Sequence, residues 1–184
     1  MKSQRAAMEL SISTIVVIVL AMSMLILGLV LVKNIFSGAQ NIVDMNQDQL
    51  ENKISKMYGE DQKMVIYPSS QMVNVKQGES GGFGFGIKNL NQGSSANIQF
   101  SYSIIISDED MVAKCGISKE ALMDYMVTPQ EESGLSLASG ELTTAKVIFE
   151  TDVGAPLCTV RFRINTFAGE QPYASGFVDV KFTA

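Results

Sequence analysis

The chain opens with a long stretch that carries no charged residue. From Leu10 to Val32 the residues are apolar, small or hydroxyl-bearing. As a helix, these roughly 23 residues would be about 34 Å long, against a bilayer hydrocarbon core of about 30 Å. The apolar core of a secretory signal peptide is only about 7 to 15 residues long. The stretch 10–32 therefore predicts a transmembrane span.

The flanks and interior of this stretch refine the prediction. Small residues within it permit close packing of helices in lipid, although a plain lipid-facing anchor explains them equally well: Ser13, Thr14, Ala21, Ser23 and Gly28. Lys2 and Arg5 precede the span and Lys33 follows it. The positive-inside rule favours a cytoplasmic N-terminus, so we expect a single-pass cell-membrane protein whose C-terminal domain is extracellular.

Helical periodicity continues past the span but becomes amphipathic. Apolar residues such as Ile42, Leu50 and Ile54 recur near helical spacing, with polar residues between them. The pattern predicts one long helix over 7–58, first transmembrane and then amphipathic.

After Gly59 the apolar period changes to two. We expect eight strands, at 63–67, 72–75, 82–88, 97–106, 135–137, 142–150, 157–167 and 174–182, and a short helix at 118–126 with Ser118 as its N-cap. Short strands separated by turn signals are typical of an antiparallel sandwich. The predicted fold class is α+β, with the long helix followed by an immunoglobulin-like β-sandwich over 62–184.

A glycine-rich strand stands out within this domain. In the run from Gly82 to Ile87, Phe83, Phe85 and Ile87 alternate with glycines. Alternation places the apolar side chains on one face and leaves the other bare, unlike a phosphate loop, in which glycines precede a helix. We expect the bare face to receive the subunit's own helix or a neighbouring subunit, or else to be covered by cross-strand aromatic residues.

The chain has two cysteines, Cys115 and Cys158. In an oxidising exterior such a pair usually forms a disulfide, although two buried thiols are the alternative. A bridge across about 43 residues would stabilise the fold by roughly 4 kcal/mol in the chain-entropy model.

Composition argues against catalysis. The chain has no His, the commonest general base, and no recognisable catalytic motif, so we expect no enzyme and no catalytic residues. We expect no cofactor, and no metal site because two sulfurs without His fall short of four zinc ligands. The 14 Lys and Arg against 19 Asp and Glu form no basic run, so nucleic acid is not an expected partner.

The N-terminus resembles the class III signal of archaeal type IV pilins and archaellins. The resemblance rests on Arg5, Ala6, Ala7, Met8 and Glu9, followed at once by the apolar stretch. It implies that residues 1–6 are a basic leader, cleaved by a prepilin peptidase after Ala6, or alternatively after Ala7. The sequence departs from many type IV pilins in placing Glu9 third, not fifth, in the mature chain.

The resemblance also implies a function. The chain would be a structural subunit of an extracellular pilus-like filament, with helices in the core and β-domains outside. Its partners would be copies of itself, the membrane and the peptidase. Glu9 near a helix N-terminus could pair with a neighbour's free α-amino group during assembly, or simply mark the interface. The alternative function is an uncleaved, membrane-anchored binding module, an adhesin or receptor.

Overall fold

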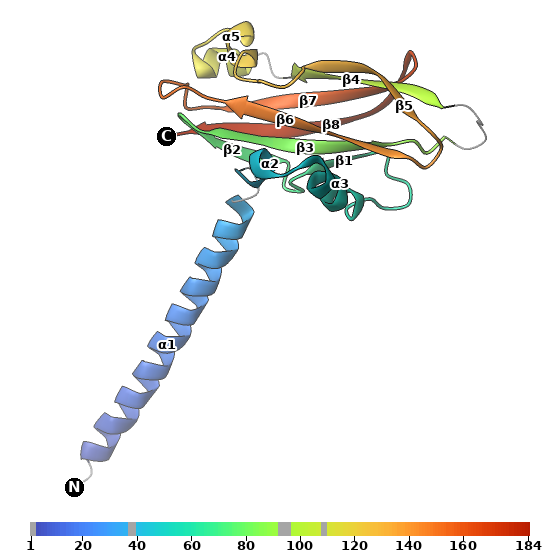
Figure 1. The fold of residues 1–184 in the computed structure, drawn as a ribbon. Helices are drawn as coiled ribbons and strands as arrows, with labels where there is room; N and C mark the ends of the chain where they lie inside the picture. The colour runs from blue at the N-terminus through green and yellow to red at the C-terminus, as the bar shows by residue number, and fades with distance from the viewer. Residues whose placement is uncertain (1–2, 37–39, 92–96, 108–109) are drawn as a thin grey trace. The chain divides into compact units, whose positions relative to one another are not determined.

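The computed structural model describes the backbone of residues 3–36, 40–91, 97–107 and 110–184, and side chains within 14–30, 42–91, 97–107, 110 and 113–184. The chain divides into two compact units, Met1–Ser37 and Gly38–Ala184. The first unit contains one helix, α1 (Ser3–Phe36) (Figure 1). The second contains the remaining helices and all the strands.

The prediction of one continuous helix over 7–58 is wrong. Two further helices, α2 (Gln40–Asp44) and α3 (Gln47–Ser55), follow α1 and belong to the second unit. The helical path is broken before α3 because Asn46 is extended and caps the N-terminus of α3. The amphipathic periodicity was a real signal of helical structure, but the apolar face it marks is buried on the β-domain and does not prolong α1.

The expected transmembrane span at 10–32 is corrected as well. Among the residues that the structure describes, no helix is long and apolar enough to cross a membrane. The structure therefore does not support a single-pass membrane protein with an extracellular C-terminal domain.

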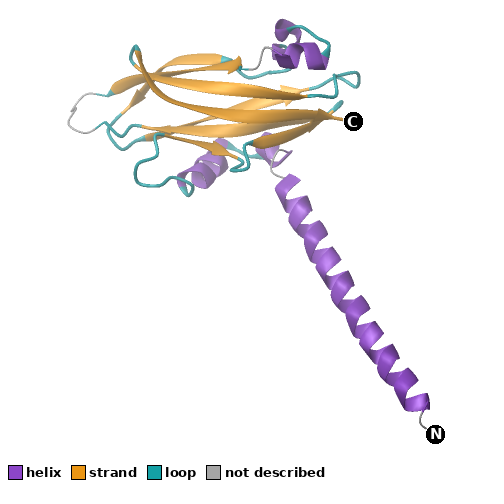
Figure 2. Ribbon diagram, turned by 180° about the vertical axis from the view of Figure 1, so that it is seen from behind, coloured by secondary structure: helices purple, strands orange, loops and turns teal. Residues whose placement is uncertain are grey.

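The second unit is an immunoglobulin-like β-sandwich of two sheets, as the sequence predicted (Figure 2). The three-stranded sheet has the order β1-β3-β6, from β1 (Met64–Tyr67), β3 (Ser80–Lys88) and β6 (Leu142–Glu150). The five-stranded sheet has the order β2-β8-β7-β4-β5, from β2 (Met72–Lys76), β8 (Gln171–Thr183), β7 (Thr159–Ala168), β4 (Ile98–Ile106) and β5 (Glu131–Leu137).

All eight predicted strands are present, with ends shifted by a few residues. The exception to the expected antiparallel arrangement is β2, which pairs with β8 in parallel, Val73 facing Val180. The other paired strands named above run antiparallel, and β3 matches β6 along its whole length, from Ser80 opposite Glu150 to Lys88 opposite Leu142. The parallel pairing joins strands about a hundred residues apart, so local periodicity could not predict it.

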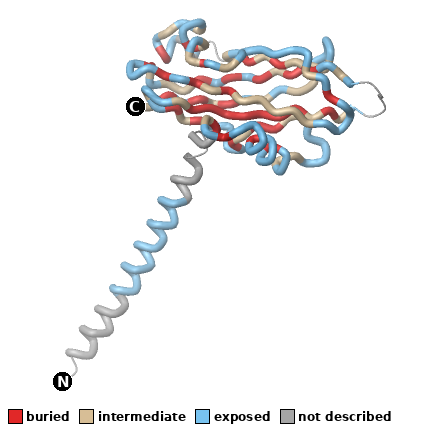
Figure 3. Tube along the Cα trace, viewed as in Figure 1, coloured by how far each residue is buried: buried red, intermediate tan, exposed pale blue. Residues whose placement is uncertain are grey.

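The core lies between the two sheets, and most of the buried residues of the second unit lie on their strands (Figure 3). Phe83, Phe85 and Phe149 of the small sheet are fully buried, and so is Phe162 of the large one. Aromatic rings meet across the interior, with the Phe149 and Phe162 centroids 5.1 Å apart. Such pairs add about 0.5–1.5 kcal/mol to the stabilisation from burial itself.

Two short helices, α4 (Asp110–Cys115) and α5 (Lys119–Met123), connect β4 to β5. The predicted N-cap is confirmed, since the Ser118 hydroxyl accepts a hydrogen bond from the Ala121 amide at 3.2 Å. Leu122 and Met126 anchor this segment because both are buried in the core.

Candidate assembly surfaces

Helix α1 carries apolar side chains that nothing in its own unit covers. Between Ile15 and Val30, its large apolar side chains are 48 to 74% exposed (Figure 3). Burying one Val, Leu, Ile or Met side chain is worth roughly 1.5–3 kcal/mol in water. Thirteen such side chains would therefore contribute well over 10 kcal/mol if a partner covered them.

This exposed surface extends around the whole helix. Six consecutive residues, from Ile15 to Leu20, are all large, apolar and exposed. At 3.6 residues per turn they point in every direction around the axis. A helix that is apolar on all sides requires burial on all sides. One neighbouring helix would cover only a stripe, so complete burial needs several neighbours.

Small residues let such neighbours come close. A side-chain carbon on Gly28 would meet nothing within 4 Å. The Ser23 hydroxyl donates to the Leu20 carbonyl at 2.9 Å, so this polar group is satisfied inside the helix. Small residues such as Gly and Ser are typical of closely packed helix interfaces in membranes.

The bare face of β3 receives the subunit's own helix, which confirms one of the three expectations for it. A Cβ added to Gly84 would lie 2.6 Å from the Leu50 Cδ1 atom, and one on Gly86 would lie 2.5 Å from the Ile54 Cγ2 atom. Leu50 and Ile54 of α3 are both fully buried there. Glycine is favoured at 84 and 86 because the helix side chains occupy the space that a side chain would need.

A second, smaller apolar cluster forms at this contact. It joins Ile42 of α2 and the two α3 residues to Val65 of β1, with Met57, Tyr58, Tyr67 and Leu142 packed against it. Burial in this cluster raises the pKa of the Tyr58 phenol well above its usual range. The cluster closes the outer face of the small sheet with residues of the same chain.

Polar contacts fix α3 on the sheet, and sequence analysis missed them. The Asn46 side chain accepts from the Gln49 amide at 2.8 Å, and the Gln49 side chain accepts from the Asn46 amide at 3.1 Å. Gln47 donates to the backbone carbonyl of Thr144 on β6 at 2.9 Å, and Lys146 donates to the Met45 carbonyl. The Asn-x-x-Gln spacing is a capping-box signal, which could have located the start of α3.

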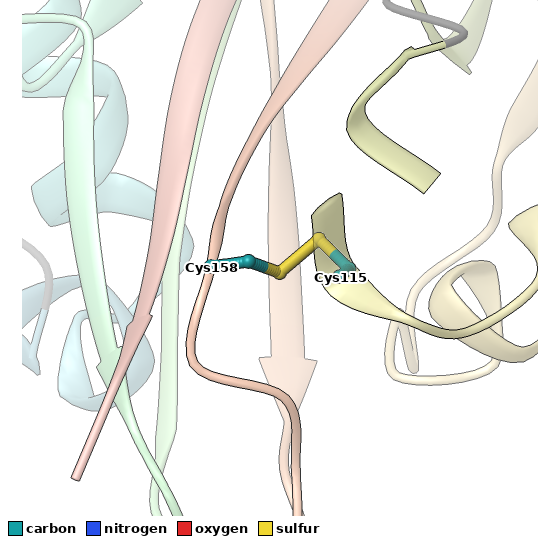
Figure 4. The surroundings of a disulfide bond; sticks show 2 residues. All are labelled: Cys115 and Cys158. Atoms are coloured by element: carbon teal, nitrogen blue, oxygen red, sulfur yellow. A yellow bond between two sulfur atoms is a disulfide. The ribbon is translucent and has the colours of Figure 1, made fainter. Parts of the chain in front are cut away.

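The predicted disulfide is present. Cys115, at the end of α4, is bonded to Cys158, just before β7, with 5.4 Å between their Cα atoms (Figure 4). The bridge ties the α4–α5 segment to the large sheet. Together with Leu122 and Met126 it holds this connection against the core.

The residues of the predicted leader site lie in α1 but outside the part of the helix whose side chains are described. This applies to Arg5, Ala6, Ala7 and Glu9. The predicted cleavage and the predicted assembly role of Glu9 remain predictions.

Two observations on the described residues concern metal binding and polar chemistry. Among them, no group of three or more His, Cys, Asp or Glu residues is placed to hold a metal ion. The Tyr102 hydroxyl donates to Glu132 at 3.0 Å in an open cleft of about 410 Å³ at the β4–β5 edge. Burial, and then the Glu132 carboxylate, raise the pKa of Tyr102, so this phenol stays protonated and serves as a hydrogen-bond donor.

Comparison with known proteins assigns no family. No protein-family model and no curated protein matches the chain. The PapD-like domain 7 of human CEP192 has a TM-score of 0.40 and 11% identity, covering 66% of this chain and 84% of that one. The periplasmic chaperone SfaE has a TM-score of 0.36 and 13% identity, and the match covers 65% of this chain and 56% of SfaE. A family 123 glycoside hydrolase from Clostridium perfringens has a TM-score of 0.35 and 14% identity, covering 60% of this chain and 22% of the hydrolase.

Likeness at this level assigns neither partner nor activity. The fold and its surfaces define the chain as a disulfide-bonded, immunoglobulin-like β-sandwich with a separate apolar helix. The sandwich has a core of its own and covers the bare face of β3 with its own helices. The exposed apolar surface of α1 is the feature that a function has to explain.

Proposed function

We propose that the chain is a structural subunit that assembles with copies of itself into a pilus-like filament. In this assembly the α1 helices of neighbouring copies pack together as the core, and the β-sandwiches form the outer layer. The observation that carries the proposal is the exposure of apolar side chains on every side of α1, from Ile15 to Val30. A bundle of identical helices is the arrangement that covers such a helix all round.

The β-sandwich supports the proposal through its self-sufficiency. Its apolar core lies within the unit, its disulfide ties the α4–α5 segment in place, and α3 occupies the glycine face of β3. A unit of this kind can pack on the outside of a filament without depending on a neighbour for its fold. A structural role also needs no catalytic group.

Helix variants of the full chain test the proposal. We expect the wild type to sediment as large oligomers and to show filaments by negative-stain electron microscopy. The double variant Leu20→Glu/Leu27→Glu should remain monomeric, because burying two carboxylates in a helix bundle costs several kcal/mol each. Glu60→Lys, an exposed change in the other unit, is the control and should assemble like the wild type.

Two results would contradict the proposal. One is a wild type that stays monomeric across the accessible concentration range, and the other is a helix variant that assembles as the wild type does. Far-UV circular dichroism and the intact disulfide must show that the sandwich of each variant is folded. Loss of assembly in a folded variant then reports on α1 alone.

The expected leader processing belongs to the same proposal and has its own test. Chain purified from its native source should lack residues 1–6 and begin at Ala7, as the resemblance to class III signals implies. Intact mass and N-terminal sequencing measure this directly. If the purified chain still contains Met1 and Arg5, the leader is not cleaved, and the proposed processing by a prepilin peptidase is refuted.

A further inference from the structure

The outer face of the five-stranded sheet carries a row that combines apolar and cationic side chains. Ile105 of β4 is paired in register with Arg163 of β7, and Arg163 with Phe177 of β8. The Arg163 guanidinium carbon lies 4.8 Å from the centre of the Phe177 ring. Ile105 and Phe177 are 44% and 38% exposed, although the alternate residues of the same strands are buried.

The adjoining row of the same sheet face also combines exposed apolar and charged side chains. Met72 of β2 is in register with Asp179 of β8, which in turn faces Arg161 of β7. Arg161 binds the Asp179 carboxylate with two hydrogen bonds of 2.7 and 2.8 Å. Lys181 is exposed two residues farther along β8. We call these two rows with Lys181 the basic-apolar face: three cations, one carboxylate and the exposed apolar side chains of Met72, Ile105 and Phe177.

A cleft of opposite charge lies elsewhere on the same sandwich. It has a volume of about 500 Å³ and forms where the β2–β3 turn, the loop after α5 and the end of β6 meet. No Lys or Arg is among its lining residues, which include four carboxylates: Glu79, Asp124, Glu150 and Asp152. Glu79 is 3.9 Å from the Lys76 ammonium.

The acidic cleft is also bordered by exposed apolar side chains. Val127 lines it and is 53% exposed. Val153 is 81% exposed, and its Cγ2 atom would lie 3.4 Å from a side-chain carbon on Gly78, another lining residue. Within the described part of the second unit, the exposed large apolar side chains thus fall mainly on two surfaces of opposite charge.

We infer that these two surfaces bind each other between copies: the acidic cleft of one subunit receives the basic-apolar face of the next. A second copy is the occupant because the chain itself carries both complementary halves. Contact between two basic faces or two acidic clefts would place like charges together and be repelled, whereas face against cleft is attractive. The net charge of −5 makes copies repel one another, and attraction between these two surfaces opposes that repulsion.

The geometry of this contact suits a filament. The face and the cleft are different surfaces, so the contact is heterologous and leaves a free face and a free cleft at the ends of every chain of subunits. Heterologous contacts that do not close into a ring generate open helical assemblies. The inference rests on the proposed filament and adds to it the contact that orients neighbouring sandwiches.

Charge reversal in the full chain tests the contact. The variants are Arg163→Glu, Asp152→Arg and the two combined, with Lys56→Glu and Glu170→Arg as exposed controls of matched charge change. Assembly is followed by sedimentation against protein concentration in 50 mM and 500 mM NaCl. Each single variant should raise the concentration needed for assembly about tenfold or more, and the combined variant should restore it to near the wild-type value. High salt should weaken wild-type assembly.

The outcomes separate this inference from the proposed function. If the charge variants assemble as the wild type does, or if the combined variant is no better than the singles, the face-to-cleft contact is refuted. The Leu20→Glu/Leu27→Glu variant, run in parallel, reports on the filament. If the helix variant is monomeric and the charge variants assemble normally, the filament proposal stands and the face-to-cleft contact is refuted. A wild type that never assembles overturns both.

Discussion

The packing of α3 on the glycine face of β3 can be tested by a double-mutant cycle at Leu50 and Gly84. Leu50→Ala removes a fully buried side chain and should lower the free energy of unfolding by about 2–5 kcal/mol. Gly84→Ala introduces a carbon 2.6 Å from Leu50 Cδ1, against an optimal separation of about 3.5–4.0 Å. Leu50 must move by about 1 Å, and such overpacking costs about 1–3 kcal/mol.

The losses in the free energy of unfolding caused by Leu50→Ala and Gly84→Ala should not add. In the double variant the methyl group added at position 84 enters the space that the Leu50 side chain leaves, so it fills part of the cavity and meets no obstacle. We therefore expect the double variant to be about 1–2 kcal/mol more stable than the sum of the single losses predicts, which is within the range for residues in direct contact.

The measurement is urea unfolding of the full chain in a mild detergent that keeps α1 from associating. The chain has no Trp, so unfolding is followed by far-UV circular dichroism and Tyr fluorescence. Gly154→Ala is the matched control, because a Cβ there meets nothing within 4 Å and φ is not positive. Its effect should be within about 0.5 kcal/mol. Additivity of the Leu50 and Gly84 losses within about 0.5 kcal/mol would refute the direct contact.

Three further predictions concern the stability of the β-sandwich. Reducing the Cys115–Cys158 bond, which spans 43 residues, should lower the free energy of unfolding by up to about 4 kcal/mol, and an unchanged urea midpoint in dithiothreitol would contradict this. Because folding raises the pKa of Tyr102, the protonated phenol contributes fully to the free energy of unfolding below about pH 10, and this contribution is lost progressively as the pH rises further. Tyr102→Phe should therefore flatten the decline in the free energy of unfolding from about pH 10 upward, which urea unfolding at a series of pH values measures. Asn46→Ala removes the cap of α3 and should cost about 0.5–2 kcal/mol in urea unfolding, whereas Asn46→Asp, which keeps the acceptor, should cost much less.

The strands could be predicted because their signals are local. Alternation of apolar and polar residues, ended by Gly, Asn and Ser, marks each strand without reference to its neighbours. The alternation at Phe83, Phe85 and Ile87 also predicted that the glycines between them form a bare face. What covers that face depends on a segment about thirty residues away. Local alternation therefore does not distinguish the subunit's own helix from a neighbouring subunit or from cross-strand aromatic residues.

The helix was mispredicted for the same reason. An apolar stripe at Ile42, Leu50 and Ile54 shows that a helix buries one face, but it does not show against what. The stripe fits an extended helix leaving α1 as well as it fits two short helices folded back on a sheet. The capping box at Asn46 was the local sign of a new helix start. Local patterns could not predict the two surfaces proposed to join copies. The basic-apolar face forms only when the sheet brings β2, β4, β7 and β8 together, and the acidic cleft forms only where the β2–β3 turn, the loop after α5 and the end of β6 meet.

The shorter helices also limit what the proposed filament core can contain. Because the apolar face of α3 is buried on Gly84 and Gly86, it has no apolar surface left for a neighbouring copy. Among the described helices, α1 alone retains a large exposed apolar surface. Its 34 residues would span about 51 Å, and about 45 Å would remain in a chain that begins at Ala7. The sandwiches must then make their contacts through their own surfaces, which is what the basic-apolar face and the acidic cleft would provide.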